Sequence, residues 1–201
     1  MTKIDELKSR SLTEGVLDDE TIHHEFVSGL HGRKLDFDKI PTASDLYELW
    51  VEAYIEYIQN NYQVQPSMII GVANGANRLA VSIAAGLGNG TLGLMTEKET
   101  SKSSRFHPSV EDIIRSYKPK FVLIVEDVGT AGTTSATAAI KALEAWVQSV
   151  EVLNTWQRSE SLTKLEEAGI SYRSLIVEQL PNYPPESCEY CKQGVKLVEH
   201  D

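Results

Sequence analysis

The sequence predicts an α/β protein with an open, mostly parallel sheet that is flanked by helices. Between residues 43 and 177, segments with a strand pattern alternate with segments that have a helix pattern, as in right-handed βαβ units. The clearest strand, Phe121-Val122-Leu123-Ile124-Val125, is continuously apolar, which suits a central parallel strand covered on both faces. With 201 residues, 41% of them hydrophobic, the chain can bury the core of one domain.

The first elements follow from apolar spacing. A helix is expected at 43–61, where apolar side chains recur at spacings of three and four and Ser44 or Asp45 is placed to cap the first turn. An apolar run, a segment rich in alanine and small residues, and a second short run then predict a strand at 68–72, a helix at 76–87 and a strand at 91–95.

The alternation continues through the second half of the chain. Val110, Ile113 and Ile114 fall on one face of a helix expected at 108–117. After the central strand, the remaining elements are expected as a helix at 133–147, a strand at 150–153, a helix at 161–168 and a strand at 175–177. The domain is therefore divided into an α/β core at 41–180, an N-terminal segment 1–40 that forms a hood over the ligand edge of the sheet, and a tail at 181–201.

The charge balance limits the classes of partner. The chain carries 19 Lys and Arg against 29 Asp and Glu, a formal net charge of −10, which argues against general binding of nucleic acid or of an anionic membrane surface. A phosphorylated ligand held by a local site remains compatible with this balance. No apolar run reaches the roughly 18 residues that span a bilayer, and the N-terminus has no signal-peptide pattern, so a cytoplasmic location is expected.

The residues after the central strand carry the chemistry. They read Glu126-Asp127-Val128-Gly129-Thr130-Ala131-Gly132-Thr133-Thr134, and a helix is expected next. Ligands of open α/β sheets bind beyond the carboxyl ends of strands, where glycines let backbone N–H groups approach an anion and a helix N-terminus favours negative charge. The threonines add hydroxyl donors. This loop is suited to a phosphate, while the two carboxylates can bind sugar hydroxyls or a Mg²⁺-bound ligand.

The alternative is a plain strand, turn and helix in which Glu126 and Asp127 form a solvated cap. The joint occurrence of an apolar strand, an acid pair and a loop of threonine and glycine favours the ligand site. The pattern differs from a P-loop, which ends in Gly-Lys-Ser/Thr, and Gly86-Leu87-Gly88-Asn89-Gly90 lacks the spacing of a dinucleotide fingerprint.

The segment Val122–Thr134 closely resembles the binding signature for phosphoribosyl diphosphate (PRPP) of type I phosphoribosyltransferases. The resemblance implies the fold of that family. It also implies that Glu126 and Asp127 face the ribose hydroxyls and hold Mg²⁺ directly or through water, that Asp127 takes part in catalysis, and that the loop from Val128 to Thr134 cradles the 5′-phosphate.

Other segments resemble orotate phosphoribosyltransferases most. Gly71-Val72-Ala73-Asn74-Gly75-Ala76 resembles the family's diphosphate loop, which implies that Ala73, Asn74 and Gly75 bind PRPP. The stretch Phe26–Asp38 resembles the family's N-terminal stretch, in which an aromatic residue packs on the base, and this implies that role for Phe37. The stretch Gln157-Arg158-Ser159-Glu160 resembles Asp-Arg-x-Glu, so Arg158 is implied to contact a base carboxylate, with Thr130 beside the base.

The family supplies catalytic lysines from a mobile loop. The matching stretch, Met95–His107, is polar and without periodicity, and it is expected to be a flexible loop. Lys98 matches the family's first lysine. The usual catalytic position is Ser101 here, so Lys102, one residue further on, is the second candidate. The diphosphate loop has no lysine, and Arg78 is the cation nearest to it in sequence.

The activity that the resemblance implies is transfer of the phosphoribosyl group of PRPP to a nucleobase nitrogen, with Mg²⁺ and release of diphosphate. Orotate is the expected base and orotidine 5′-phosphate the expected product, in pyrimidine nucleotide synthesis. A homodimer is implied, in which the mobile loop of one subunit reaches its neighbour's site. The alternatives are a phosphoribosyltransferase for another base and a PRPP-binding regulator without catalysis.

The tail contains the only cysteines, Cys188 and Cys191, in one Cys-x-x-Cys motif. Zinc in a structural site usually has four ligands, so His200, Asp201 or a second subunit would have to supply the other two. On this ligand count, a reduced surface turn is favoured over zinc at Cys188 and Cys191. A thioredoxin-like redox role has less support still, because no strand and helix surround the pair.

Overall fold

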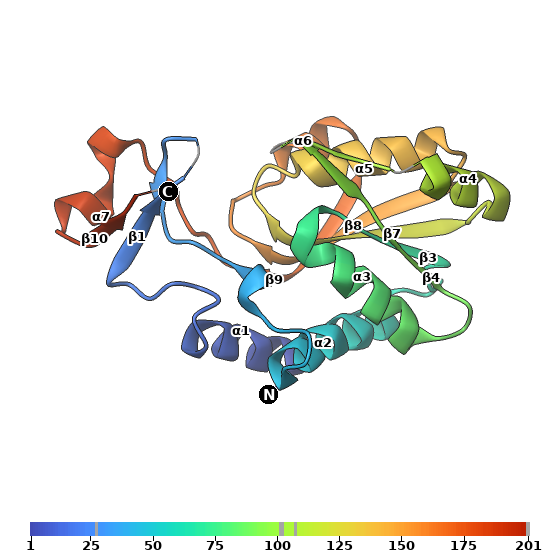
Figure 1. Ribbon diagram of the computed structural model, residues 1–201, viewed down its shortest axis with the longest axis horizontal. Coiled ribbons are helices and arrows are strands. Elements are labelled where there is room, and N and C mark those ends of the chain that lie inside the picture. The colour runs from blue at the N-terminus through green and yellow to red at the C-terminus, as the bar shows by residue number, and fades with distance from the viewer. Residues whose placement is uncertain (27, 101–102, 107, 200–201) are drawn as a thin grey trace.

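The computed structural model (Figure 1) describes residues 1–26, 28–100, 103–106 and 108–199, with the side chains at 73–74, 98–100, 103–105 and 108 excepted. Its main sheet has five parallel strands in the order β4-β3-β7-β8-β9, which confirms the expected open α/β architecture. The strands are β3 (Met68–Gly71), β4 (Leu92–Met95), β7 (Phe121–Gly129), β8 (Ser149–Gln157) and β9 (Ser171–Val177).

Helices cover both faces of this sheet (Figure 1). One layer consists of α1 (Lys3–Thr13), α2 (Asp45–Asn61) and α3 (Ala73–Leu87), and the other of α4 (Pro108–Tyr117), α5 (Thr133–Glu144) and α6 (Thr163–Glu167). Alternate residues of β7 enter the two cores: Leu123 and Val125 pack with the first layer, and Val122 and Ile124 with the second. This burial on both faces explains why β7 has no polar alternation.

Two element boundaries have clear local causes. The hydroxyl of Ser44 accepts the N–H of Tyr47 at 3.2 Å, which caps α2 as expected. The helix expected to reach 147 ends at Glu144, because Trp146 adopts a left-handed φ of 73° that a helix cannot continue through.

The hood is built from two segments that lie far apart in the sequence. The strands β1 (Ile22–Glu25), β2 (His31–Gly32) and β10 (Lys196–Val198) form a separate sheet in the order β10-β1-β2, beside the short α7 (Glu189–Lys192). Figure 1 shows this sheet at the left, apart from the main one. The segment expected as a hood at 1–40 is therefore divided: β1 and β2 form this sheet together with β10 of the tail, whereas α1 packs on the main body. Two short 3₁₀ turns, η1 (Phe37–Lys39) and η2 (Pro185–Ser187), complete these regions.

The stretch expected to be a loop without structure contains a hairpin. Its strands β5 (Glu97–Thr100) and β6 (Ser103–Arg105) pair antiparallel, with Lys98 opposite Ser104. The prediction of an unpatterned loop was wrong at this point, because backbone pairing between two polar strands leaves no hydrophobic pattern to detect. No helix among the described residues has the length and apolar character that crossing a membrane requires.

Candidate active site

Two adjacent carboxylates, Glu126 and Asp127, lie in the last part of β7, where Glu126 contacts α5 and Asp127 lies beside α3. Gly71, the last residue of β3, pairs with Val125, while β7 and β8 continue side by side to Gly129 and Gln157, so the acids lie just beyond the end of β3. Glu126 is buried, and the Ser135 hydroxyl donates to its Oε2 at 2.8 Å. Burial raises the pKa of Glu126 to about 8; the Ser135 hydroxyl opposes this shift, and the Asp127 carboxylate adds to it.

Asp127 is the more accessible carboxylate of the pair. The Val128 N–H donates to its Oδ1 at 2.8 Å. Burial raises the pKa of Asp127 to about 6; the Val128 N–H opposes the rise, and the carboxylates of Asp38 and Asp36 add to it. Negative charge thus accumulates here without a described cation to balance it, and a divalent cation with its preference for oxygen ligands would reverse these pKa shifts.

Buried polar side chains of α2 and β8 form a hydrogen-bond network that supports the backbone of the acid pair. The Tyr54 hydroxyl donates to the carbonyl oxygens of Glu126 at 3.2 Å and Leu153 at 3.3 Å, and it lies 2.9 Å from Thr155 Oγ1. Trp50 Nε1 donates to the same Thr155 oxygen at 2.8 Å. These buried contacts from α2 hold the ends of β7 and β8 in place, and with them the backbone that presents the acids.

The loop after the acid pair has the features of an anion site. Gly132 precedes α5 with a left-handed φ of 75°, and a Cβ there would lie 2.9 Å from Leu165 Cγ. No described side chain caps this helix, so N–H groups of its first turn, which contains Thr133 and Thr134, are oriented toward the loop without a side-chain partner. Residues that follow β8 fix the backbone of this loop. Ser159 Oγ donates to the carbonyl oxygen of Thr130, and the Lys164 N–H donates to that of Ala131 at 2.9 Å.

A second helix begins beside the acid pair. A Cβ on Gly75, in the first turn of α3, would lie 2.6 Å from Asp127 Oδ2 and 3.2 Å from Asp38 Oδ1. Only glycine therefore allows this close approach of helix and carboxylate. The predicted residues Ala73 and Asn74 occupy the same turn, but their side chains lie outside the described part of the chain.

Arg78 does not serve as the missing cation of this turn. Its guanidinium donates to the carbonyl oxygens of Phe37 at 3.1 Å and Ile40 at 2.6 Å and lies over the ring of Tyr47. Arg78 therefore fastens the segment after the hood to α3 and α2.

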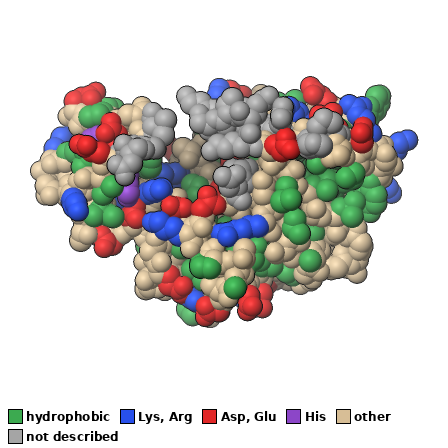
Figure 2. All heavy atoms as spheres, in the orientation of Figure 1, with side chains coloured by type: hydrophobic (Ala, Val, Ile, Leu, Met, Phe, Trp, Pro, Cys, Tyr) green, Lys and Arg blue, Asp and Glu red, His purple; other side chains and the backbone are tan. Residues whose placement is uncertain are grey.

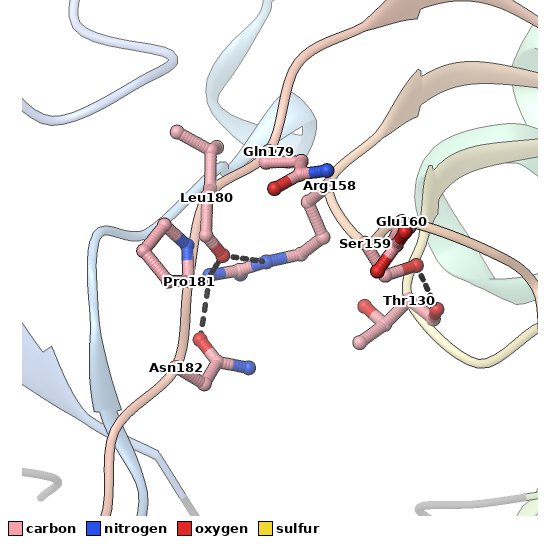
Figure 3. Close-up of a pocket in the computed structure, with 8 residues that line it drawn as sticks. All are labelled: Thr130, Arg158, Ser159, Glu160, Gln179, Leu180, Pro181 and Asn182. Atoms are coloured by element: carbon pink, nitrogen blue, oxygen red, sulfur yellow. Dashed lines mark hydrogen bonds between the residues drawn. The ribbon is translucent and has the colours of Figure 1, made fainter.

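Arg158 follows β8 and borders a pocket of about 220 Å³ that Thr130 also lines (Figure 3). The guanidinium donates to Leu180 O at 3.2 Å, to Arg33 O at 3.1 Å and to Asn182 Oδ1 at 2.7 Å. Only 7% of Arg158 is exposed, and burial lowers its pKa. All the acceptors that it reaches among the described residues are neutral, so a buried positive charge faces the pocket edge without a carboxylate partner.

The aromatic side chain near Arg158 differs from the predicted one. Phe37 is 1% exposed and packs against Trp50 at a centroid distance of 4.7 Å, so the expectation that it packs on a base is wrong in this structure. The ring that Arg158 covers is Phe26, at 5.2 Å. Both phenylalanines belong to the stretch that suggested the role; the one at 37 faces the core because η1 turns it onto α2.

The predicted lysines are not placed by the structure. Lys102 lies outside the described residues, and so does the side chain of Lys98, whose backbone belongs to β5. The base of the hairpin is fixed by Asn77, whose side-chain amide donates to Thr96 O at 2.8 Å and accepts the Thr96 N–H at 3.0 Å. These bonds attach the start of the hairpin to α3, next to the acid pair.

Three residues of the site were not identified from the sequence. Ser135 continues the threonine run of the motif, so its hydroxyl was a detectable signal, and Asp38 lies in the stretch that the resemblance covered. Tyr54 carried no such signal, because its helical spacing indicates only a core position. In the space-filling view, Lys or Arg and Asp or Glu side chains lie beside one another where the hood meets the main body (Figure 2). The chain carries a net charge of −10, but at this place side chains of both signs are present.

Comparisons with known proteins point to one family. A family model described as "Phosphoribosyl transferase domain" matches residues 43–168. The orotate phosphoribosyltransferase of Pelotomaculum thermopropionicum is 31% identical over 136 residues, which make up 66% of this chain and 65% of that relative. The match thus spans slightly less than two thirds of that relative's length.

Solved structures share the fold at low sequence identity. Orotate phosphoribosyltransferase from Aeropyrum pernix superposes with a TM-score of 0.62 at 21% identity, covering 87% of this chain and 92% of that one. A phosphoribosyltransferase from Corynebacterium diphtheriae gives 0.65 at 20% identity, covering 88% and 96%. The family match spans well over half of the sequence and includes the acid pair and its loop, and on this basis the chain belongs to the phosphoribosyl transferase family.

Proposed function

We propose that this protein transfers the phosphoribosyl group of PRPP to a ring nitrogen of orotate and releases diphosphate. The observation that carries the proposal is the arrangement around the end of β7. The acid pair, two helix N-termini and a pocket bordered by a buried arginine meet at one edge of the sheet. Each group matches one part of the reactants: the ribose hydroxyls, the phosphates and an acidic base.

In the proposed reaction, the base nitrogen forms a bond to C1′ of the ribose while the bond from C1′ to the diphosphate oxygen breaks, and the proton of that ring nitrogen is lost to solvent. The electron pair of that bond leaves with diphosphate, and positive charge develops on the sugar ring, as in glycoside hydrolysis. Asp127 and Glu126 would stabilise this charge by accepting hydrogen bonds from the ribose hydroxyls. The N–H groups at the start of α5 would hold the 5′-phosphate, and those at the start of α3 the diphosphate.

Carboxylate oxygens such as those of Asp127 and Glu126 are the ligands that Mg²⁺ prefers, and burial raises the pKa of both groups, an effect that a bound cation would oppose. When bound, Mg²⁺ would neutralise charge on the departing diphosphate.

Arg158 supports orotate over uracil as the base. A buried guanidinium that reaches only neutral acceptors gains more from a carboxylate than from a carbonyl group. Orotate carries such a carboxylate on its ring and uracil does not. Arg158, next to the loop at Thr130, is therefore the expected determinant of base choice.

Substitution of Arg158 tests this assignment. Arg158→Gln is expected to raise the KM for orotate at least about thirtyfold, the factor that corresponds to the loss of one charge-assisted hydrogen bond. The KM for PRPP should change less than about threefold. Arg115→Gln, on the exposed last turn of α4, is the matched control and should change neither. Equal loss for both substrates would show that Arg158 only maintains the fold.

Calorimetry separates the alternatives. Binding of PRPP with Mg²⁺ but no turnover on orotate, uracil, hypoxanthine or adenine would favour a PRPP-binding regulator, whereas turnover on one of the other bases would reassign the substrate. Failure to bind PRPP would exclude both the enzyme and the regulator.

A further inference from the structure

Two histidines of the hood and the two cysteines of the tail form one cluster. His23 lies on β1, His31 on β2, and Cys188 and Cys191 at the two ends of the first turn of α7. One ligand atom from each of the four lies within 4.8 Å of all the others. His23 Nε2 and His31 Nδ1 each lie 3.3 Å from Cys191 Sγ. Side chains from three separate segments thus point at a single spot.

These separations match those of a tetrahedral ligand set. Zinc bonds of about 2.3 Å to sulfur and about 2.0 Å to nitrogen, at tetrahedral angles, place sulfur and nitrogen about 3.5 Å apart. The Cys191 N–H points at Cys188 Sγ at 3.5 Å, an arrangement that stabilises a thiolate and orients a metal ligand. The tail therefore needs neither His200 nor Asp201, which lie outside the described residues, to complete four ligands.

The hood lacks the apolar interior that would otherwise hold it together. Among the described residues of 19–34 and 181–199, the only buried side chains are His23, His31 and Cys188. Residues of β1, β2 and β10 are likewise absent from both hydrophobic cores of the described structure. A three-stranded sheet with so little apolar burial is the kind of small unit that proteins commonly stabilise with a metal or a disulfide.

We propose that His23, His31, Cys188 and Cys191 bind one structural Zn²⁺ that fastens the C-terminal tail to the N-terminal strands. Two thiolates and two imidazoles in a closed tetrahedral set favour zinc over the hard cations that carboxylates select. The four protein ligands leave no position open for a substrate, so the ion stabilises the hood and takes no part in the transfer chemistry.

The cluster also connects to the pocket at Arg158. His31 and Tyr183 exchange two backbone hydrogen bonds of 2.8 Å, and the adjacent Asn182 accepts from Arg158 at 2.7 Å. The ion would therefore fix the position of one wall of the pocket. This consequence depends on the proposed function, but the metal site itself does not.

Metal content tests the site directly. Full-length protein purified without chelator or added metal is expected to contain about one zinc per chain by mass spectrometry of the metal, because four-ligand cysteine and histidine sites bind zinc tightly near pH 7. Cys191→Ser and His23→Gln should lower the content below about a fifth of an equivalent, since each removes one of four ligands. His24→Gln is the matched control: it lies on the same strand, but its ring faces the Asp18 carboxylate at 2.7 Å.

A second measurement covers the case in which the variants do not fold. Replacement of the ion by Co²⁺ in the wild-type chain should give the visible absorption of a tetrahedral site and a thiolate-to-cobalt charge-transfer band. Less than about a fifth of an equivalent of metal in wild type, or full metal content in Cys191→Ser, would overturn the proposal. So would a disulfide between Cys188 and Cys191 in protein that contains no metal.

Discussion

At the scale of single residues, the site is defined by buried ionisable groups that have no partner of opposite sign among the side chains that the structure describes. Glu126 and Asp127 are carboxylates with raised pKa values, and Arg158 is a buried cation that reaches neutral acceptors. Each costs free energy in the ligand-free protein, and a ligand that carries the opposite charge would offset that cost. Such groups are therefore expected to favour binding at the expense of stability.

Glu126 gives this expectation a pH dependence. Its pKa rises from 4.5 to about 8 on folding, so the folded protein holds the proton more tightly than the unfolded chain. The resulting stabilisation is present below pH 4.5 and is lost as the pH rises through about 8. Glu126→Gln cannot ionise. We expect its Tm at pH 9 to exceed that of wild type by more than about 4 °C, the shift that 1–2 kcal/mol causes in a domain of this size.

The same comparison at pH 5 supplies the control. There the folded wild-type carboxyl group is protonated and pH 5 lies only slightly above 4.5, so the difference in Tm should be much smaller than at pH 9. A difference in Tm that does not change between pH 5 and pH 9 would show that the carboxylate is not the source. PRPP affinity should fall in the variant at both values.

Gly75 tests the contact between helix and carboxylate. Gly75→Ala would place a Cβ 2.6 Å from Asp127 Oδ2, so the carboxylate or the start of α3 must move. We expect kcat/KM to fall at least about a hundredfold, as for a displaced catalytic group, with a loss of thermal stability of only a few degrees. Activity near that of wild type would mean that the position of Asp127 next to α3 is unimportant.

At the scale of elements, the loop between β7 and α5 depends on a left-handed glycine. Gly132→Ala would add strain of about 1–2 kcal/mol at φ +75° and a contact of 2.9 Å with Leu165. We expect weaker binding of inorganic phosphate and of PRPP, both measured by calorimetry, because the first turn of α5 must shift. Gly169→Ala shares the positive φ but has open space around it, and it should leave phosphate binding unchanged.

The sequence predicted best those elements whose spacing of apolar residues reflects which side chains are buried. The apolar run 121–125 and the spacing of α2 predicted both elements, although β7 continues to Gly129, so the acid pair lies within the strand rather than after it. The end of β8 was missed because Asn154, Thr155 and Gln157 are polar yet buried, and hydrogen bonds with α2 and β9 explain their position. Phe37 was assigned to the base because a sequence stretch does not show which of two phenylalanines faces the core.

At the scale of the whole molecule, β1 and β2 pair with β10 near the other end of the sequence, and together they form the separate sheet of the hood (Figure 1). The cluster of His23, His31, Cys188 and Cys191 brings together residues more than 150 positions apart, and no local motif predicts such a meeting. The Cys-x-x-Cys motif showed only half of the ligand set.

This arrangement predicts two regions of different stability. Addition of a strong chelator should speed amide hydrogen exchange in β1, β2 and β10, because the proposed ion replaces an apolar core there. Exchange in β3 and β7 should not change, since those strands lie between two hydrophobic layers. Equal protection of the hood with and without chelator would contradict this division.

The central claim is that the edge of the sheet at Glu126 and Asp127 transfers a phosphoribosyl group. It is tested most directly by diphosphate release in a mixture of protein, PRPP, Mg²⁺ and orotate. We predict release that requires all four components and falls more than about tenfold in Asp127→Asn, which keeps the shape but loses the charge. The absence of diphosphate release and of nucleotide product with orotate, uracil, hypoxanthine and adenine would contradict the claim.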